Sequence, residues 1–205
     1  TTSMQRDVYA GKSSEIDGLV YEAVRMGQEY GVSVPVYEKV AEKLGGTKEM
    51  SLEKAKAYLK EKGYADHVIE LEDSSATVQL AAQALGVEPG MIAKTMSFLL
   101  GDEAILILTE GTAKVDNRKY KDTFHMKAKM IPFEEVEGWI GHAPGGVCPF
   151  GIKEGIKVYL DESLKQFDTV YPAAGNDHSA VKLTIAELEE VAGAVGWVDV
   201  CKELA

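Results

Sequence analysis

Apolar residues recur every three or four positions through the first sixty residues, a pattern typical of amphipathic helices. One such pattern predicts a helix over residues 14–30. Pro35 is placed to open a second helix, which the pair Gly45-Gly46 would end. A third helix is expected from Ser51, acting as its N-cap, to Gly63.

Beyond a boundary near residues 45–50, strand-like and helix-like stretches alternate without a regular βαβ rhythm. The clearest feature is a hairpin, in which apolar runs flank the polar turn 101–103. Strands are expected at 67–71, 93–100, 104–109, 156–160 and 170–171, and helices at 77–85 (capped by Thr77), 132–139 and 185–191. We therefore predict an α+β domain with a mixed sheet over 50–205, preceded by a helical appendage at 1–46.

Composition narrows the class of protein. With 205 residues and 45% hydrophobic content, the chain is long enough to bury a full core. No apolar run approaches the roughly 20 residues that a membrane helix needs, so no membrane partner is expected. Two cysteines, Cys148 and Cys201, without a signal-peptide pattern indicate a reducing compartment. We therefore expect a cytoplasmic protein.

The formal net charge of −11 disfavours general attraction to nucleic acid, so any such contact must be local. One segment offers it, because six cations against two acids gather between residues 114 and 129 around Tyr120 and Phe124. Cations with aromatic residues meet phosphates and stack on unpaired bases. A solvated amphipathic helix followed by a loop explains the pattern equally well. The cations are Lys114, Arg118, Lys119, Lys121, Lys127 and Lys129.

Two further features point to a site. The run Gly145-Gly146-Val147-Cys148-Pro149 predicts a sharply bent loop, which would either aim backbone N–H groups at a carbonyl or be an ordinary turn. Lys94 interrupts an apolar run and shares a strand face with Met96 and Phe98. Its amine would either reach water at the sheet edge or enter a pocket, where it would stabilise negative charge.

These residues resemble the YbaK/EbsC family of free-standing aminoacyl-tRNA editing domains, whose relatives are also inserted in bacterial prolyl-tRNA synthetases. The likeness covers roughly residues 50–204 and rests on three motifs: Ile92-Ala93-Lys94-Thr95, the G-x-x-x-P loop Gly145 to Pro149 with Phe150-Gly151, and Tyr171-Pro172-Ala173-Ala174-Gly175-Asn176. The resemblance implies a YbaK-like editing fold. It also implies that the lysine and the loop face the aminoacyl ester and terminal adenosine of a mischarged tRNA.

The resemblance suggests roles for single residues. Catalytic roles are expected for Lys94, Gly145, Gly146 and His178, the last lying where prolyl-synthetase insertion domains tend to carry a histidine. Substrate binding is expected from Val147, Cys148, Pro149, Phe150, Gly175 and Asn176, and tRNA binding from Lys114, Arg118, Lys119 and Lys121. The family is understood to use water or the substrate's own side chain as nucleophile, so neither cofactor nor metal is expected.

Other chemistry remains open for three polar residues. Cys148 would be either a nucleophile or a small buried thiol, the commoner role for such a residue. His142 would either position water or bond to backbone. A zinc site can be written from these two residues and His178, but no paired metal-ligand spacing supports it.

Residues 1–46 resemble the carboxyl end of ketopantoate reductase, in which the residues matching Ser3 and Glu15 touch the substrate. The dinucleotide motif G-x-G-x-x-G and the domain with the catalytic lysine are missing from the sequence. We therefore expect a remnant of a gene fusion or of a longer reading frame. Its helices would bury their apolar faces on the main domain or on a second copy, giving a homodimer.

Three functions follow from these observations. The first is a trans-editing hydrolase that deacylates mischarged tRNA, with proline tRNA carrying alanine or cysteine as the first expectation and prolyl-tRNA synthetase as a partner. The second is a binding module of the same fold that grips the aminoacyl end without cleaving it. The third and weakest is a fragment of a ketopantoate reductase fusion.

Overall fold

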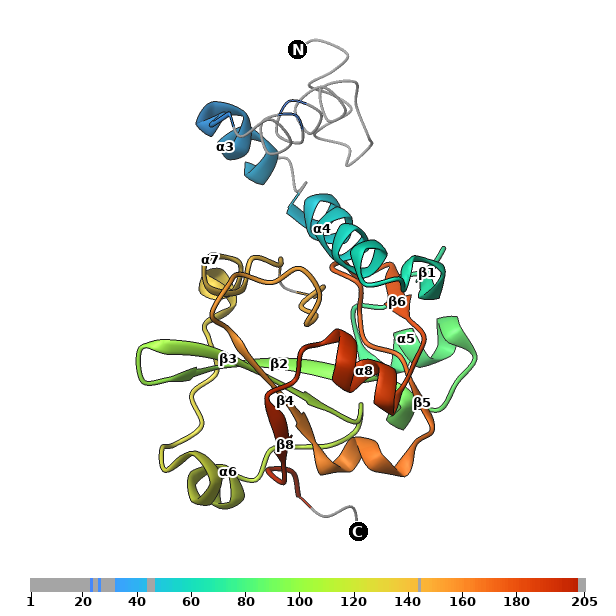
Figure 1. Ribbon diagram of the computed structural model, residues 1–205, viewed down its shortest axis with the longest axis vertical. Helices are drawn as coiled ribbons and strands as arrows, with labels where there is room; N and C mark the ends of the chain where they lie inside the picture. Colours follow the sequence, from blue (N-terminus) through green and yellow to red (C-terminus); the bar gives the residue numbers. More distant parts are fainter. Residues whose placement is uncertain (1–22, 24–25, 27–31, 44–46, 144, 203–205) are drawn as a thin grey trace. The chain divides into compact units, whose positions relative to one another are not determined.

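The computed structural model describes residues 23, 26, 32–43, 47–143 and 145–202 (Figure 1). The chain divides into two compact units, Thr1–Met50 and Ser51–Ala205. Most of the helix expected over 14–30 lies outside the described residues. Helix α3 (Pro35–Lys43) begins at the proline, as predicted. No helix in the described part of the chain is long and apolar enough to cross a bilayer.

The second unit is built on a four-stranded mixed sheet in the order β2-β3-β4-β8. The predicted hairpin is confirmed: β2 (Lys94–Leu100) and β3 (Glu103–Thr109) are antiparallel, joined by a turn at 101–102. Strand β4 (Lys157–Asp161) runs parallel to β3, and β8 (Gly196–Val198) runs parallel to β4. The prediction of an α+β domain with a mixed sheet is therefore confirmed.

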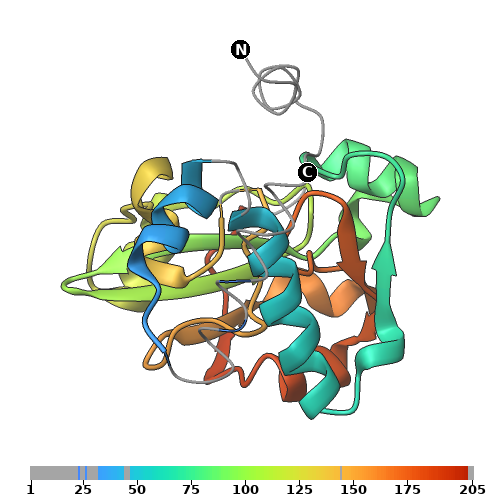
Figure 2. The ribbon, with the colours of Figure 1, turned by 90° about the horizontal axis from the view of Figure 1, so that it is seen from above.

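Smaller elements surround this sheet (Figure 2). Two antiparallel pairs join β1 (Val68–Glu70) to β6 (Ser179–Val181) and β5 (Thr169–Val170) to β7 (Leu183–Thr184). The helices are α4 (Thr47–Glu61), α5 (Val78–Leu85), α6 (Asn117–Phe124), α7 (Val136–Ile140) and α8 (Ile185–Val191). Short 3₁₀ turns lie at Ala65–His67, Pro89–Met91, Phe133–Glu135 and Glu162–Gln166.

Two helix predictions are corrected. Ser51 is not an N-cap, because α4 already begins at Thr47. Its buried hydroxyl instead accepts a hydrogen bond from the backbone N–H of Ala143 at 3.1 Å. The helix expected at 132–139 is split into a 3₁₀ turn and the short α7. The cap at Thr77 is confirmed, since its hydroxyl accepts from the N–H of Leu80 at 3.2 Å.

Strand β3 is buried on both faces, which explains its unbroken apolar sequence. Leu106 and Leu108 enter the larger core, to which α4, α7 and α8 contribute. Ile105 and Ile107 enter a smaller core that Tyr120 of α6 closes. Helices α6 and α7 therefore lie on opposite sides of the sheet, as Figure 1 shows.

The glycine loop (residues 145–151) and the segment before β6 approach α4 so closely that side chains would not fit. A Cβ at Gly146 would lie 2.2 Å from the carbonyl oxygen of Gly175, and one at Gly175 would lie 2.3 Å from that of Ser51. A Cβ at Gly151 would lie 2.8 Å from the carbonyl oxygen of Lys54. These contacts fix the backbone of the loop against α4.

We predict that Gly146→Ala destabilises the protein more than Gly145→Ala. Alanine at 146 must push one backbone against another, and overpacking costs about 1–3 kcal/mol or more. Gly145 has a positive φ of 90° but nothing within 4 Å of a Cβ, so only about 1–2 kcal/mol of backbone strain is expected. Urea unfolding of both variants measures the difference, and equal losses would contradict the stacked-loop description.

Candidate functional site

A pocket of about 220 Å³ lies among the start of β2, helix α5 and the glycine loop. Its apolar wall includes Val78, Ala81, Leu85, Ile92, Val147, Tyr171 and Ala173. Its polar side chains are Ser75, Thr77, Lys94, Thr95 and Ser179. None of the described residues that line it is Asp, Glu, His or Cys, so its chemistry depends on one amine, hydroxyl groups and backbone.

Lys94 opens β2 and is half-buried at the pocket wall. Its Nζ donates hydrogen bonds to the carbonyl oxygens of Gly111, at 3.2 Å, and Ala113, at 2.6 Å. Burial lowers the pKa of the Lys94 amine from its ordinary value, an effect that the nearby Cys201 and Glu110 oppose. The amine is therefore held by backbone carbonyls and does not extend freely into water at the sheet edge.

The glycine loop meets the same pocket through Gly145 and Val147. The N–H of Gly146 is already bonded to the carbonyl oxygen of Ala143 at 3.1 Å. The amides of Gly145 and Val147 are therefore the loop's candidate donors toward a bound carbonyl. Of the residues expected from the sequence, Lys94, Gly145 and Val147 are brought together here.

Cys148, Pro149 and Phe150 are buried and do not line this pocket. The sulfur of Cys148 lies 3.7 Å from Nε2 of His142. The same Nε2 atom lies 2.6 Å from the carbonyl oxygen of Phe150. Burial raises the pKa of Cys148 to about 12 and lowers that of His142 to about 4. Both side chains are therefore neutral at pH 7, and the geometry gives no support to a Cys148 thiolate nucleophile.

Gly175, Asn176 and His178 do not line the pocket. Oδ1 of Asn176 accepts hydrogen bonds from the N–H of His178, at 3.0 Å, and from the hydroxyl of Ser179, at 2.6 Å. The exposed ring of His178 has Nδ1 3.1 Å from Oδ1 of Asp177. Asn176 thus orients Ser179, which does line the pocket.

Sequence reasoning assigned no site role to the four Ser and Thr hydroxyls that line the pocket, and two of them, those of Ser179 and Thr95, are buried. Ser179 is 1% exposed at the start of β6 and follows the quoted motif that ends at Asn176. Thr95 has a buried Oγ1 without a hydrogen-bond partner in the described part of the chain. Its position beside Lys94, as a polar residue in an apolar run, was the available signal.

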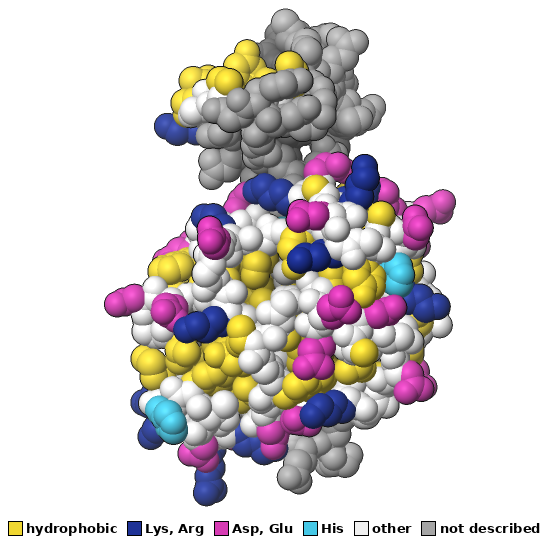
Figure 3. All heavy atoms as spheres, in the orientation of Figure 1, with side chains coloured by type: hydrophobic (Ala, Val, Ile, Leu, Met, Phe, Trp, Pro, Cys, Tyr) yellow, Lys and Arg dark blue, Asp and Glu magenta, His cyan; other side chains and the backbone are white. Residues whose placement is uncertain are grey.

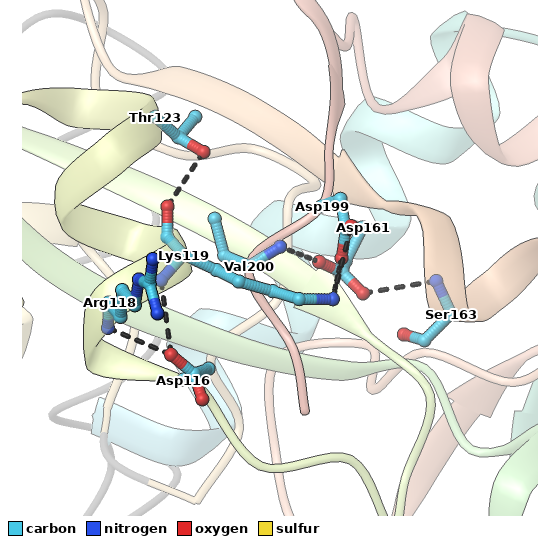
Figure 4. Close-up of polar contacts among 8 residues, drawn as sticks. All are labelled: Asp116, Arg118, Lys119, Thr123, Asp161, Ser163, Asp199 and Val200. Atoms are coloured by element: carbon cyan, nitrogen blue, oxygen red, sulfur yellow. Dashed lines mark hydrogen bonds and ion pairs between the residues drawn. The ribbon is translucent and has the colours of Figure 1, made fainter. Parts of the chain in front are cut away.

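None of the four cations expected to bind tRNA lines the pocket. The first of them in the sequence, Lys114, directly follows the turn that holds Lys94. Lys114 follows Ala113, and its charge lowers the pKa of Lys94. The other three lie on α6, where Asp116 caps the helix through the N–H groups of Arg118 and Lys119. Nζ of Lys119 lies 2.8 Å from Oδ1 of Asp199. Figure 4 draws this ion pair.

Charges of both signs mix on the face of the second unit drawn in Figure 3, where hydrophobic side chains are also visible between them. In the part of the chain that the structure describes, no group of three or more His, Cys, Asp or Glu side chains is placed to hold a metal ion.

The fold and pocket define a mixed-sheet α+β domain with a small, mostly apolar binding site. Residues 72–191, more than half of the chain, match the aminoacyl-tRNA editing domain family. The chain belongs to this family, and the YbaK-like resemblance seen in the sequence is confirmed. Residues 1–48 match the C-terminal region of ketopantoate reductase, as the sequence also indicated.

Two proteins and one solved structure are among those similar to this chain. The Bacillus subtilis protein YwhH is 46% identical over 155 residues, which span 75% of this chain and 99% of that protein. A crystal structure of a candidate trans-editing enzyme for prolyl tRNA synthetase has 31% identity and a TM-score of 0.68, covering 75% of this chain and 98% of the other. The proline–tRNA ligase of B. subtilis is 28% identical over 137 residues, 64% of this chain but only 23% of the ligase.

We predict that His142 makes stability fall at acid pH. Its pKa is about 4 in the folded protein and 6.5 ordinarily, so the folded state binds fewer protons between these values. The stabilisation is complete above pH 6.5 and is lost as the pH falls through 4, on the order of 3 kcal/mol. Urea unfolding at pH 7 and pH 4 measures the loss, which should be smaller in His142→Gln. An equal loss in both proteins would assign the acid sensitivity to carboxylates.

Proposed function

We propose that this chain is a trans-editing hydrolase that deacylates mischarged aminoacyl-tRNA. The observation that carries the proposal is the pocket in which Lys94 and the Gly145–Val147 loop meet, in a chain of the aminoacyl-tRNA editing family. Proline tRNA carrying cysteine or alanine is the first substrate to test. The similar solved structure and the matching proline–tRNA ligases support that choice.

The size and lining of the pocket support a small aminoacyl group. At about 220 Å³ it lies below the roughly 300–1,000 Å³ typical of pockets for drug-sized ligands. Its wall is mostly apolar, which suits an uncharged side chain better than a charged one. The terminal adenosine would then lie at the mouth, with the aminoacyl ester reaching inward.

The proposed reaction is hydrolysis of the ester that joins the amino acid to ribose. Water, or a nucleophilic side chain of the substrate itself, attacks the ester carbonyl carbon, because no thiolate, imidazole or carboxylate lines the described pocket. The amides of Gly145 and Val147 and the Lys94 ammonium stabilise the negative charge that forms on the carbonyl oxygen. The carbon–oxygen bond to ribose then breaks, and the ribose oxygen takes up the proton that the attacking nucleophile loses.

The tRNA would cross from the pocket mouth to the cations on α6. Lys114 lies next to the turn that holds Lys94, and Arg118 and Lys121 are exposed on α6, so they suit phosphate contacts. Such contacts position the nucleic acid without reading its sequence. We further propose that the protein acts in the cytoplasm, since both of its cysteines are free, buried thiols. Association with prolyl-tRNA synthetase and a homodimer through the N-terminal helices stay predictions.

The alternative function is binding of the aminoacyl end without cleavage. One observation favours it: the Lys94 amine is already bonded to two carbonyls, and no side-chain base lines the described pocket. The ketopantoate reductase alternative has only the match over residues 1–48 in its favour. NADPH titration followed by fluorescence tests that third function directly.

We predict that purified protein releases alanine or cysteine from mischarged proline tRNA and that Lys94→Ala lowers kcat about 100-fold or more. The loss is expected because the ammonium stabilises the developing negative charge. Lys60→Ala, at an exposed position of α4, is the matched control and should retain turnover. Bound tRNA without turnover on any ester would establish the binding module, whereas full activity in a folded Lys94→Ala would remove this lysine from the mechanism.

We predict that reversing the charge of Arg118 and Lys121 raises KM for mischarged tRNA and leaves kcat nearly unchanged. Each lost phosphate contact should also reduce the salt dependence of binding, by roughly one in the slope of log K against log salt. The double variant Lys60→Glu with Lys182→Glu makes the same change in net charge at exposed positions outside the 114–129 segment. If KM and the salt slope match the wild type, the α6 cations do not contact tRNA.

A further inference from the structure

A short turn after β3 receives the Lys94 amine, and Glu110 organises it. The Glu110 side chain is 1% exposed. Its carboxylate accepts hydrogen bonds from the backbone N–H of Thr112, at 2.9 Å, and from the Thr112 hydroxyl, at 2.8 Å. The Glu110 N–H donates to Oγ of Ser163 at 3.2 Å. The carbonyls that bind Lys94, those of Gly111 and Ala113, therefore belong to a turn that has its own hydrogen bonds through Glu110.

Surrounding backbone encloses the same turn. A Cβ at Gly111 would lie 2.1 Å from the carbonyl oxygen of Pro89, so this residue must be glycine. A Cβ at Gly90 would lie 3.2 Å from Oε2 of Glu110 and 2.5 Å from the ring of Phe167. The carboxylate is thus packed against Gly90 and shielded from water. A carboxylate in such a place is costly unless donors and an opposite charge compensate it.

The charged groups that act on the Lys94 amine are few. Burial lowers its pKa most; Cys201 and Glu110 raise it, and Lys114 lowers it further. Burial raises the pKa of the Cys201 thiol to about 12, so this thiol is neutral at pH 7. Among these groups, Glu110 is therefore the acidic side chain that favours the charged form of Lys94.

We propose that Glu110 is a positioning residue of the site: its buried carboxylate closes the turn that holds the Lys94 ammonium at the pocket wall and balances the charge of that ammonium. It does not touch the substrate and acts through Lys94 and the carbonyls of Gly111 and Ala113. The catalytic consequence rests on the proposed function. The link between the two side chains does not, because it is measurable without turnover.

The test uses the full chain with ¹³C-labelled lysine and the variant Glu110→Gln, which keeps the shape of the side chain but removes its charge. The Lys94 signal is assigned by its loss in Lys94→Arg. We expect the titration midpoint of Lys94 to move to lower pH in Glu110→Gln, because the neutralised neighbour no longer favours the ammonium. The alkaline limb of kcat for deacylation should move in the same direction. At pH 8, kcat should fall about tenfold or more.

The control is Glu154→Gln, an exposed glutamate outside this turn, which should move neither titration nor kcat. A folded Glu110→Gln with an unchanged Lys94 midpoint and pH profile would overturn the proposal. Should that variant not fold, Thr112→Val removes one bond to the carboxylate and should lower kcat about threefold, and an unchanged kcat would overturn it equally. If the wild type cleaves no ester, the proposed function fails and the Lys94 titration alone decides the role of Glu110.

Discussion

The close stacking of two loops on α4 is the constraint on which the site depends. Gly146 lies against Gly175, and Gly175 lies against the backbone of Ser51, at separations that exclude any Cβ. Ser51 adds a buried hydroxyl that accepts from the Ala143 N–H just before the loop. Because backbone contacts backbone, the loop has little freedom to shift. Gly145 and Val147 are therefore held at the pocket wall by contacts on the far side of the loop.

The sheet supplies the second fixed edge of the pocket. Strand β3 is buried on both faces, and its pairing with β2 sets Lys94 opposite Thr109 at the end of the hairpin. The next four residues turn back over β2 and offer two carbonyls to the amine. The lysine is thus anchored by the register of a hairpin and by the turn that ends it. A rigid amine and a rigid loop are what charge stabilisation without reorganisation requires.

The pattern of apolar and polar residues predicted the elements that are encoded by residues close together in the sequence. The hairpin at 93–109, the cap at Thr77 and the opening of α3 at Pro35 each follow from residues that are neighbours in the sequence. The parallel pairing of β3 with β4 and of β4 with β8 joins segments far apart in the chain, so no local pattern encodes it. The prediction that Ser51 is an N-cap was wrong for the same reason, because the backbone N–H that its hydroxyl binds lies 92 residues away in the sequence.

The same difference between local signals and long-range contacts applies to the residues of the site. Lys94, Gly145 and Val147 meet at the pocket, and their motifs were visible in the sequence. A buried thiol was the commoner of the two roles expected for Cys148, whereas the burial of Phe150 depends on the larger core and was not visible in the sequence. The roles assigned to these residues stay predictions. Ser179 reaches the pocket only because β6 pairs with β1 and places it there. The Ser179 hydroxyl carries no sequence signal of its own, so only the fold distinguishes it from a surface serine.

Under the proposed function, the pocket would recognise the amino acid, and the cations of α6 would contact the tRNA. An apolar wall discriminates one methylene by only about 1–3 kcal/mol, so it rejects side chains that are too large better than it separates small ones. The cations of α6 would contact phosphates, which are the same in every tRNA. Neither feature reads the identity of the tRNA. Selection of proline tRNA would then have to come from another surface of this chain or from a bound synthetase, which gives a physical reason for such a partner.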